Sequence, residues 1–172
     1  MLKWVETDID KVRSDAQGKL AAHILGYAGE VNQKELNERK SRGYRLGDVM
    51  GKMGVESSYE AQLRGQWGGL KLGVNGSGQV ISWLGEKPAE SGENLTLTID
   101  AKVQKAAETA LGTKKGAIVA LDPHNGAVIA MASYPSFDPN IFSSNVTPEV
   151  WQELQSQGNP FLNMALRAFP PA

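Results

Sequence analysis

Two apolar runs, residues 116–121 and 127–133, flank the five-residue loop 122–126. All loop residues except His124 are of the types that dominate tight turns. Loops of this length commonly join antiparallel strands, so the segment predicts a β-hairpin. Neither run alternates apolar with polar residues, and we therefore expect both faces of the hairpin to be covered.

Composition limits the classes of protein to which the chain can belong. With 172 residues, 41% hydrophobic and 22% charged, it suits one or two soluble globular domains. A net charge of −1 gives no reason to expect nucleic acid or an anionic membrane as a partner. The sequence contains neither a run of about 18 apolar residues nor the apolar core of a signal peptide. Because there is no cysteine and there are only two histidines, we expect no disulfide, metal site or cofactor.

Local signals also predict the elements that precede this hairpin. Residues 21–30 are apolar and interrupted by glycines, as in a short buried strand or turn. Asn32 and Glu35 have the spacing of a capping box, which would open a short helix that Gly43 can end. Residues 44–54 are rich in turn formers.

A second helix and a second hairpin are predicted further along. Val55, Tyr59 and Leu63 recur on one face of a helix that would end at Gly65. Apolar residues then alternate through 70–74, and residues 79–84 form the return strand after the turn 75–78. The polar stretch 87–92, with a proline and a glycine, is the best candidate for a domain boundary.

The region after residue 92 begins with apolar residues that alternate with threonines over 95–99. Asp100 is placed to cap a helix that Gly112 would close. The apolar stripe of this helix consists of Val103, Ala106, Ala107, Ala110 and Leu111. Thr147 and Pro148 predict the start of another short helix.

Six short motifs follow one another along the chain in an order that resembles a known family. They are Ala21–Tyr27, Gly43–Asp48, Gly54–Gly65, Leu95–Asp100, Gly116–Gly126 and Phe137–Asn140. Together they resemble the class B penicillin-binding proteins of the elongation type. The resemblance implies an α+β architecture with small antiparallel sheets and short helices. It also implies that residues 1–92 form the non-catalytic pedestal, or dimerisation-type domain, and that residues 93–172 are the incomplete N-terminal portion of the penicilloyl-serine transferase (transpeptidase) domain.

The family's chemistry is acyl transfer, in which a serine attacks the D-alanyl-D-alanine of a peptidoglycan stem peptide or reacts with a β-lactam. That serine lies in a P-P-x-S-x-x-K stretch, and S-x-N and K-T-G motifs complete the site. Here the sequence stops at Pro170-Pro-Ala172, and no serine is followed by lysine three residues later. Ser143-Ser-Asn145 spells S-x-N but precedes the missing serine, and Lys114-Lys-Gly116 departs from K-T-G at its middle position. We therefore expect no catalytic residue in this chain.

Two further patterns have simple structural interpretations. The spacing of Gly73 and Gly78 matches a phosphate loop, but Gln79 and Val80 stand where lysine and a hydroxyl residue are required, which favours a hairpin turn. His23 lies in an apolar block and is expected to be a buried side chain with its hydrogen bonds satisfied, whereas His124 lies in a turn.

The resemblance predicts a non-catalytic fragment of a peptidoglycan transpeptidase that acts during cell elongation. Its parent would be anchored in the bacterial cytoplasmic membrane and face the periplasm, and this fragment lacks the anchor. The pedestal would position the catalytic domain and contact elongation-machinery proteins, including a SEDS-type glycosyltransferase. Because the family's central sheet draws strands from both ends of the catalytic domain, residues 116–133 should keep an unpaired edge, and we expect them to form a homodimer contact.

Two alternatives remain open at this stage. The chain could be a free-standing dimerisation or adaptor module of the cell-wall machinery, without an enzymatic role; a stop codon after residue 172 would favour it, and a continuing S-x-x-K the fragment. It could also be an enzyme whose acidic and hydroxyl side chains come together only on folding.

Overall fold

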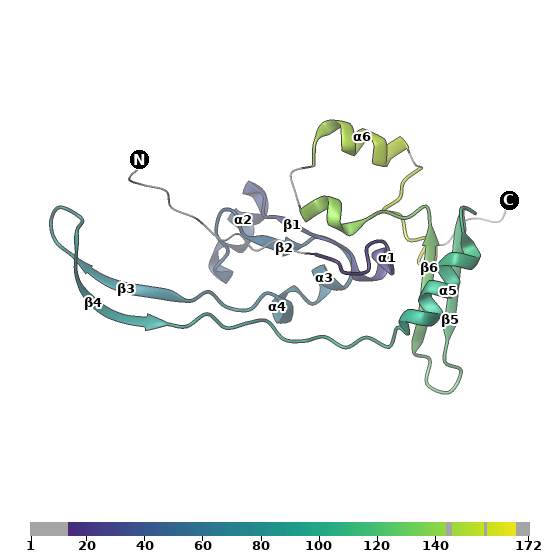
Figure 1. Ribbon diagram of the computed structural model, residues 1–172, viewed down its shortest axis with the longest axis horizontal. Helices are drawn as coiled ribbons and strands as arrows, with labels where there is room; N and C mark the ends of the chain where they lie inside the picture. Colours follow the sequence, from purple (N-terminus) through teal and green to yellow (C-terminus); the bar gives the residue numbers. More distant parts are fainter. Residues whose placement is uncertain (1–13, 144–145, 157, 168–172) are drawn as a thin grey trace, which may run out of the picture.

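The computed structural model describes residues 14–143, 146–156 and 158–167. Its elongated body carries a long two-stranded projection at one end and a hairpin backed by a helix at the other (Figure 1). The described residues contain three separate two-stranded antiparallel sheets, β1–β2, β3–β4 and β5–β6, with short helices between them. The predicted α+β class with small antiparallel sheets is confirmed.

The N-terminal elements pack closely together where a glycine allows two backbone segments to approach. A helical turn, α1 (Ala22–Leu25), is followed by the short strand β1 (Ala28–Glu30), which pairs antiparallel with β2 (Val49–Gly51). Between α1 and β1, Gly26 has φ +82°, and a Cβ on it would lie 1.8 Å from the carbonyl oxygen of Met53. Only glycine fits this backbone conformation and this close approach.

The helix α2 (Gln33–Arg39) begins with the predicted capping box. Glu35 N donates to Asn32 Oδ1 and Asn32 N donates to Glu35 Oε2, each over 2.9 Å. The 3₁₀ turn η1 (Lys40–Arg42) extends the helix, and Gly43 with φ 79° ends it, as predicted. A small core beside this helix consists of Val31, Tyr44 and Met50, with Leu36 packed against it.

The next helical region differs from its prediction. The sequence predicted one helix with an apolar face of Val55, Tyr59 and Leu63. Instead, two short helices, α3 (Gly54–Ser58) and α4 (Glu60–Leu63), meet at Tyr59, whose φ of −112° and ψ of 19° interrupt the helical backbone. Tyr59 is 41% exposed, whereas the carboxylates Glu56 and Glu60 are buried. Apolar spacing was misleading here because Glu60 has buried hydrogen-bond partners, which are described below.

The strands β3 (Gly69–Val74) and β4 (Val80–Lys87) form the predicted hairpin, joined by the turn 75–78. Residues 69–87 project from the body and are called the arm from here on (Figure 1). Every strand residue of the arm except Gly73 is exposed. The glycine-rich stretch 73–78 therefore includes the tip of a hairpin, as expected from the absence of a phosphate-loop lysine.

The helix α5 (Ala101–Leu111) packs on one face of the predicted hairpin, β5 (Gly116–Leu121) and β6 (Val128–Tyr134). The contact uses small side chains, because Ala107 lies against Ala130 and Ala132. As predicted, Asp100 caps the helix and accepts hydrogen bonds from the backbone N–H groups of Lys102 and Val103.

The predicted stripe on α5 is only partly correct. Ala107 is buried, but Val103, Ala106 and Ala110 are exposed. The residue that turns fully inward is Gln104, with 0% of its surface exposed. A polar residue can occupy this position because its amide hydrogen-bonds to the backbone of β6.

The opposite face of the hairpin also departs from the prediction that both faces are covered. On β5, Val119 is 44% exposed and Leu121 is 56% exposed. Within the described residues, β5 has β6 as its single strand partner. Residues 95–99 form no strand, but Thr98 Oγ1 donates to Val128 O over 2.7 Å and Asp100 N donates to Ile129 O over 2.9 Å, so this segment lies along β6.

The last described elements are the 3₁₀ helix η2 (Pro139–Ser143) and the helix α6 (Pro148–Ser156). Val150 N donates to Thr147 Oγ1 over 3.5 Å, and the helix begins at Pro148 as predicted. Residues 144–145 of the S-x-N sequence lie outside the described residues. No helix in the described ranges combines the length and the hydropathy needed to cross a membrane.

Candidate positioning junction and interaction arm

An aromatic cluster joins the beginning of the described chain to its end. Phe137, the first residue of the F-D-P-N motif, is 1% exposed and lies with Ala22 and Leu154 in one core. Its ring centroid lies 5.5 Å from that of His23 and 5.1 Å from that of Phe161. Tyr27, Phe142 and Trp151 continue the cluster through further ring contacts. We call this cluster, with the hydrogen bonds around it, the junction.

The polar residues of the same motif hold the N-terminal segment. Asp15 N donates to Asn140 Oδ1 over 2.8 Å, and Asn140 Nδ2 donates back to Asp15 O over 3.2 Å. Asp138 Oδ1 accepts from the side chain of Asn140 over 3.0 Å and orients it. The motif thus binds the backbone of Asp15, which lies 125 positions earlier in the sequence.

His23 is the buried histidine that the sequence predicted. Its Nε2 lies 2.7 Å from the carbonyl oxygen of Pro160, which can only accept, so Nε2 carries the proton and donates. Burial lowers the pKa of His23, partly opposed by the bond to Pro160 and by the charge of Glu108. The ring is therefore neutral at physiological pH and serves as a structural donor.

Glu108 and Gln104 on α5 form a second connection across the molecule. Glu108 Oε1 accepts from the backbone N–H of Ala21 over 2.8 Å and from Gln104 Nε2 over 2.7 Å. Gln104 also accepts from Met131 N over 2.7 Å and donates to Met131 O over 3.0 Å. The Gln104 amide thus makes the hydrogen bonds that a neighbouring strand would make at the edge of β6. Together, these hydrogen bonds connect the N-cap residue of α1, the helix α5 and the strand β6.

A buried carboxylate organises the motif regions 43–48 and 54–65. Glu60 accepts from Tyr44 Oη over 2.8 Å and from Gly51 N over 2.7 Å. Burial, and then the bond to Glu60, raise the pKa of Tyr44. The guanidinium of Arg64 lies 3.6 Å from the Tyr44 ring centroid and donates to the carbonyl of Gly43 over 2.7 Å. Asp48 also contacts Arg64, at 3.3 Å.

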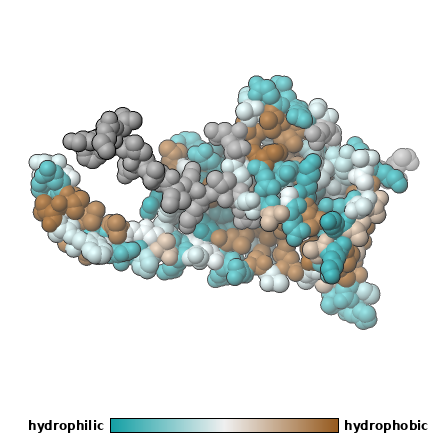
Figure 2. All heavy atoms as spheres, viewed as in Figure 1, coloured by the Kyte–Doolittle hydropathy of each residue, from teal (hydrophilic) through white to brown (hydrophobic). Residues whose placement is uncertain are grey.

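The arm exposes many apolar side chains. Cross-strand pairing places Leu72 beside Trp83 and Val74 beside Val80. At both register shifts the extra residue lies in β4, so β3 is the strand without a bulge and has the more regular edge. Figure 2 shows an apolar patch on the arm, in addition to the apolar patches on the body. The exposed apolar residues of the arm are Leu70, Leu72, Val74, Val80, Ile81, Trp83 and Leu84.

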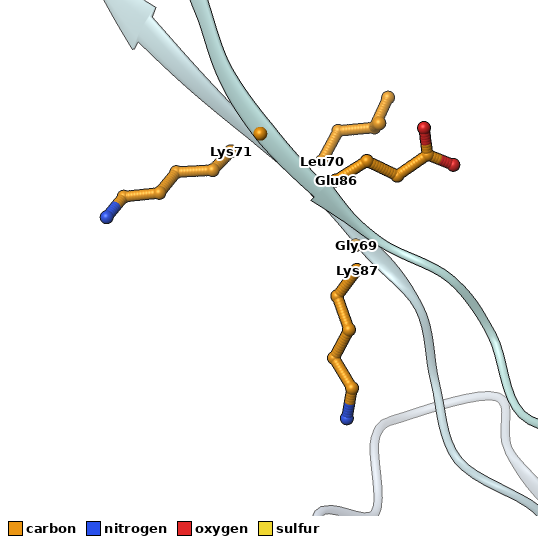
Figure 3. A pocket seen from close by; sticks show the side chains of 6 residues that line it. Gly69, Leu70, Lys71, Glu86 and Lys87 are labelled. Atoms are coloured by element: carbon orange, nitrogen blue, oxygen red, sulfur yellow. The ribbon is translucent and has the colours of Figure 1, made fainter.

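A shallow groove lies at the base of the arm (Figure 3). Leu70 and Glu86 lie side by side on one face, while Lys71 points to the other. Gly69 and Gly85 leave the floor open because they have no side chains. With no titratable group buried in it, the groove offers a surface for contact and lacks the features of a reaction centre.

Of the residues that the sequence singled out for catalytic or metal sites, His23 lies in the junction, whereas His124 lies apart from the junction and the arm. His124 lies in the exposed turn, where its Nδ1 is 3.0 Å from Asp122 Oδ1. Lys114 and Lys115 lie between α5 and β5, and Gly116 is the first residue of β5. The described residues contain no group of three or more potential metal ligands. Sequence reasoning missed the roles of Gln104, Glu108 and Glu60. Only their positions within recognised motifs or helices could have drawn attention to them.

Comparison with known proteins gives consistent relatives. The family model described as the Penicillin-binding Protein dimerisation domain matches residues 1–97. The chain is 36% identical over 174 aligned positions to the peptidoglycan D,D-transpeptidase MrdA of Escherichia coli, and the alignment covers 98% of this chain and 28% of that protein. It is 37% identical over 155 positions to penicillin-binding protein 3 of Bacillus subtilis, covering 90% of this chain and 23% of that one. The chain therefore spans about a quarter of the length of these relatives.

Two solved structures share the fold. One is penicillin-binding protein 2 of Helicobacter pylori in complex with MreC, with a TM-score of 0.76 and 31% identity, covering 88% of this chain and 28% of that one. The other is penicillin-binding protein 2 of Pseudomonas aeruginosa in complex with WCK 5153, with a TM-score of 0.71 and 31% identity, covering 91% and 31% of the two chains.

Proposed function

The chain belongs to the family of penicillin-binding proteins that carry the dimerisation domain, and from that premise we propose that it is the pedestal and first part of the catalytic domain of an elongation-type peptidoglycan D,D-transpeptidase. The boundary near residue 92 is part of this proposal. In this view the chain contains no catalytic serine or lysine, and its role is to position the domain that does.

The junction carries this proposal. The F-D-P-N motif holds Asp15 through Asn140, and His23 holds the carbonyl of Pro160. Both bonds join a residue of the pedestal to a residue of the proposed catalytic portion. A rigid, buried connection of this kind suits a domain whose role is to fix the place and orientation of another.

The whole protein would cross-link peptidoglycan by acyl transfer from D-alanyl-D-alanine stem peptides, and the same serine would be acylated by β-lactams. It would be anchored in the cytoplasmic membrane and face the periplasm. These properties are inferred from the family, because the chain covers only 28% of the MrdA sequence.

The first experiment measures covalent labelling. This chain, incubated with a fluorescent penicillin, should show no adduct by intact-mass spectrometry, while the same protein extended through a complete catalytic domain, with its P-P-x-S-x-x-K, S-x-N and K-T-G motifs, should gain one stoichiometric adduct. An adduct on any serine of this chain, or none on the extended protein, would contradict the proposal.

The proposal includes partners from the elongation machinery. MreC accompanies penicillin-binding protein 2 in the Helicobacter pylori complex. A SEDS-type glycosyltransferase is the second expected partner, on the family resemblance alone. We assign the contact with an MreC counterpart to the arm, because its apolar side chains are exposed and β3 presents a regular unpaired edge within the described residues.

The partner contact is tested with the periplasmic part of the MreC protein from the same organism. Leu72→Ser with Trp83→Ser should weaken its binding to immobilised chain at least about tenfold in biolayer interferometry, since each change removes an exposed apolar group from the contact. Leu46→Ser is the matched control, because Leu46 is 74% exposed and lies outside the arm. Equal binding by all three proteins would exclude the arm.

A further inference from the structure

The segment 158–167 has no helix or strand of its own. Phe161 packs in the junction and Asn163 Nδ2 donates to Met131 Sδ over 3.4 Å. Two further hydrogen-bonded tethers hold the segment to distant parts of the chain. At one end, His23 Nε2 donates to Pro160 O over 2.7 Å. At the other, Ser133 Oγ accepts from Met164 N over 2.9 Å and lies 3.4 Å from Leu162 O, to which it donates. Local turns shape this segment, and the tertiary contacts fix its position in the molecule.

The tether at His23 is built to be rigid. His23 is buried, and its ring packs edge-on against Phe137 at 5.5 Å. Pro160 is among the most completely buried side chains. The chain reaches Pro160 through Gly158 and Asn159, which have φ values of +82° and +67°. A left-handed conformation at Asn159 is uncommon for a residue with a side chain, so the backbone is shaped to bring the Pro160 carbonyl to the histidine.

The two tethers come from different parts of the molecule. His23 lies on α1, in the pedestal, whereas Ser133 lies on β6, in the hairpin of the proposed catalytic portion. A change in the position of the pedestal therefore acts on one end of the segment, while the hairpin holds the other.

We infer that His23 is a positioning residue that transmits the place of the pedestal to segment 158–167, and through it to the nucleophile that follows in the parent enzyme. This inference rests on the proposed function, because the serine belongs to the stretch after residue 172. His23 itself performs no proton transfer. Its contribution is to hold Pro160 so that the following residues enter the active site in the reactive geometry.

The test uses the full-length parent and this chain in parallel. His23→Phe keeps an aromatic ring against Phe137 but removes the donor, and His23→Gln restores a side-chain N–H donor. His124→Phe is the matched control, since the side chain of His124 is 91% exposed. The measured quantities are the rate constant of acylation by a β-lactam, separated from its binding constant, and the thermal midpoint of each variant.

We expect His23→Phe to slow acylation about five- to tenfold, as for the loss of one buried hydrogen bond that positions a reacting group. His23→Gln should recover a part of this loss, and His124→Phe should acylate at the normal rate. In this chain, hydrogen exchange at the Met164 amide should accelerate in His23→Phe, while the amides of β1 keep their protection.

Two results would overturn the inference. One is normal acylation by His23→Phe. The other is equal slowing in both His23 variants together with lost protection in β1, which would mean that His23 only stabilises the fold. If the wild-type parent is not acylated at all, the proposed function fails, and exchange at Met164 then decides whether the tether exists.

Discussion

Replacing Gln104 by leucine should destabilise the chain by about 3 kcal/mol. The change keeps the side-chain volume close to that of glutamine but removes three hydrogen bonds, two to Met131 and one to Glu108. A net contribution of about 1 kcal/mol per hydrogen bond gives this total, and it is an appropriate scale because Gln104 is completely buried and Met131 loses partners for both its N–H and its C=O.

Urea denaturation followed by circular dichroism measures this change. In a separate thermal unfolding experiment, the midpoint temperature should fall by about 6–12 °C, at roughly 2–4 °C per kcal/mol for a chain of this size. The control is Gln152→Leu, which makes the same chemical change at an exposed position of α6 and should leave stability within about 0.5 kcal/mol. If Gln104→Leu unfolds at the same urea concentration as the control, the amide does not hold α5 to β6.

Three further predictions follow from the second half of the chain. Ala107→Arg should lower stability by about 3 kcal/mol or more in the same assay, because Ala107 lies against Ala130 and Ala132 and leaves no room for a charged side chain; an unchanged midpoint would place this face in solvent. Backbone N–H groups of Val103 and Lys102 lower the pKa of Asp100. The contribution of Asp100 to stability is therefore complete above the unfolded pKa of 3.8 and is lost as the pH falls through the lower folded pKa. The stabilities of the wild type and Asp100→Ala, measured during acid titration, should converge below that pH, and parallel curves would contradict this. Residues 116–133 should mediate a two-fold contact between copies, seen as a concentration-dependent mass in light scattering after size exclusion, whereas a strict monomer with both strands protected from exchange would show that the chain covers its own edge.

The features predicted correctly from the sequence are those fixed by neighbouring residues. The capping box at Asn32 and Glu35, the cap at Asp100 and the turns of both large hairpins depend on a few adjacent side chains, so their patterns can be read locally. The strand β2 was missed because residues 44–54 look turn-rich and three residues give no periodicity.

Buried polar groups account for the remaining differences. Glu60 and Gln104 are buried because a tyrosine hydroxyl or a strand backbone, distant in sequence, satisfies their hydrogen bonds. Hydropathy patterns predict that such polar residues lie on the surface and that Tyr59 and Val103 are buried. In the structure, Tyr59 and Val103 are exposed. The junction was predictable only as a set of motifs, since no local signal shows that Asn140 reaches Asp15 or that His23 reaches Pro160.

The exposure of the arm makes its tip a suitable site for inserting a label. Asn75 closes the turn by itself, with its side-chain oxygen accepting from the N–H groups of Ser77 and Gln79. A Cβ on Gly76 or Gly78 would have no neighbour within 4 Å. A short epitope or a fluorogenic tag between Gly76 and Ser77 should therefore leave the folded body unchanged. Such a tag would allow the protein to be followed in living cells without a fusion at either terminus.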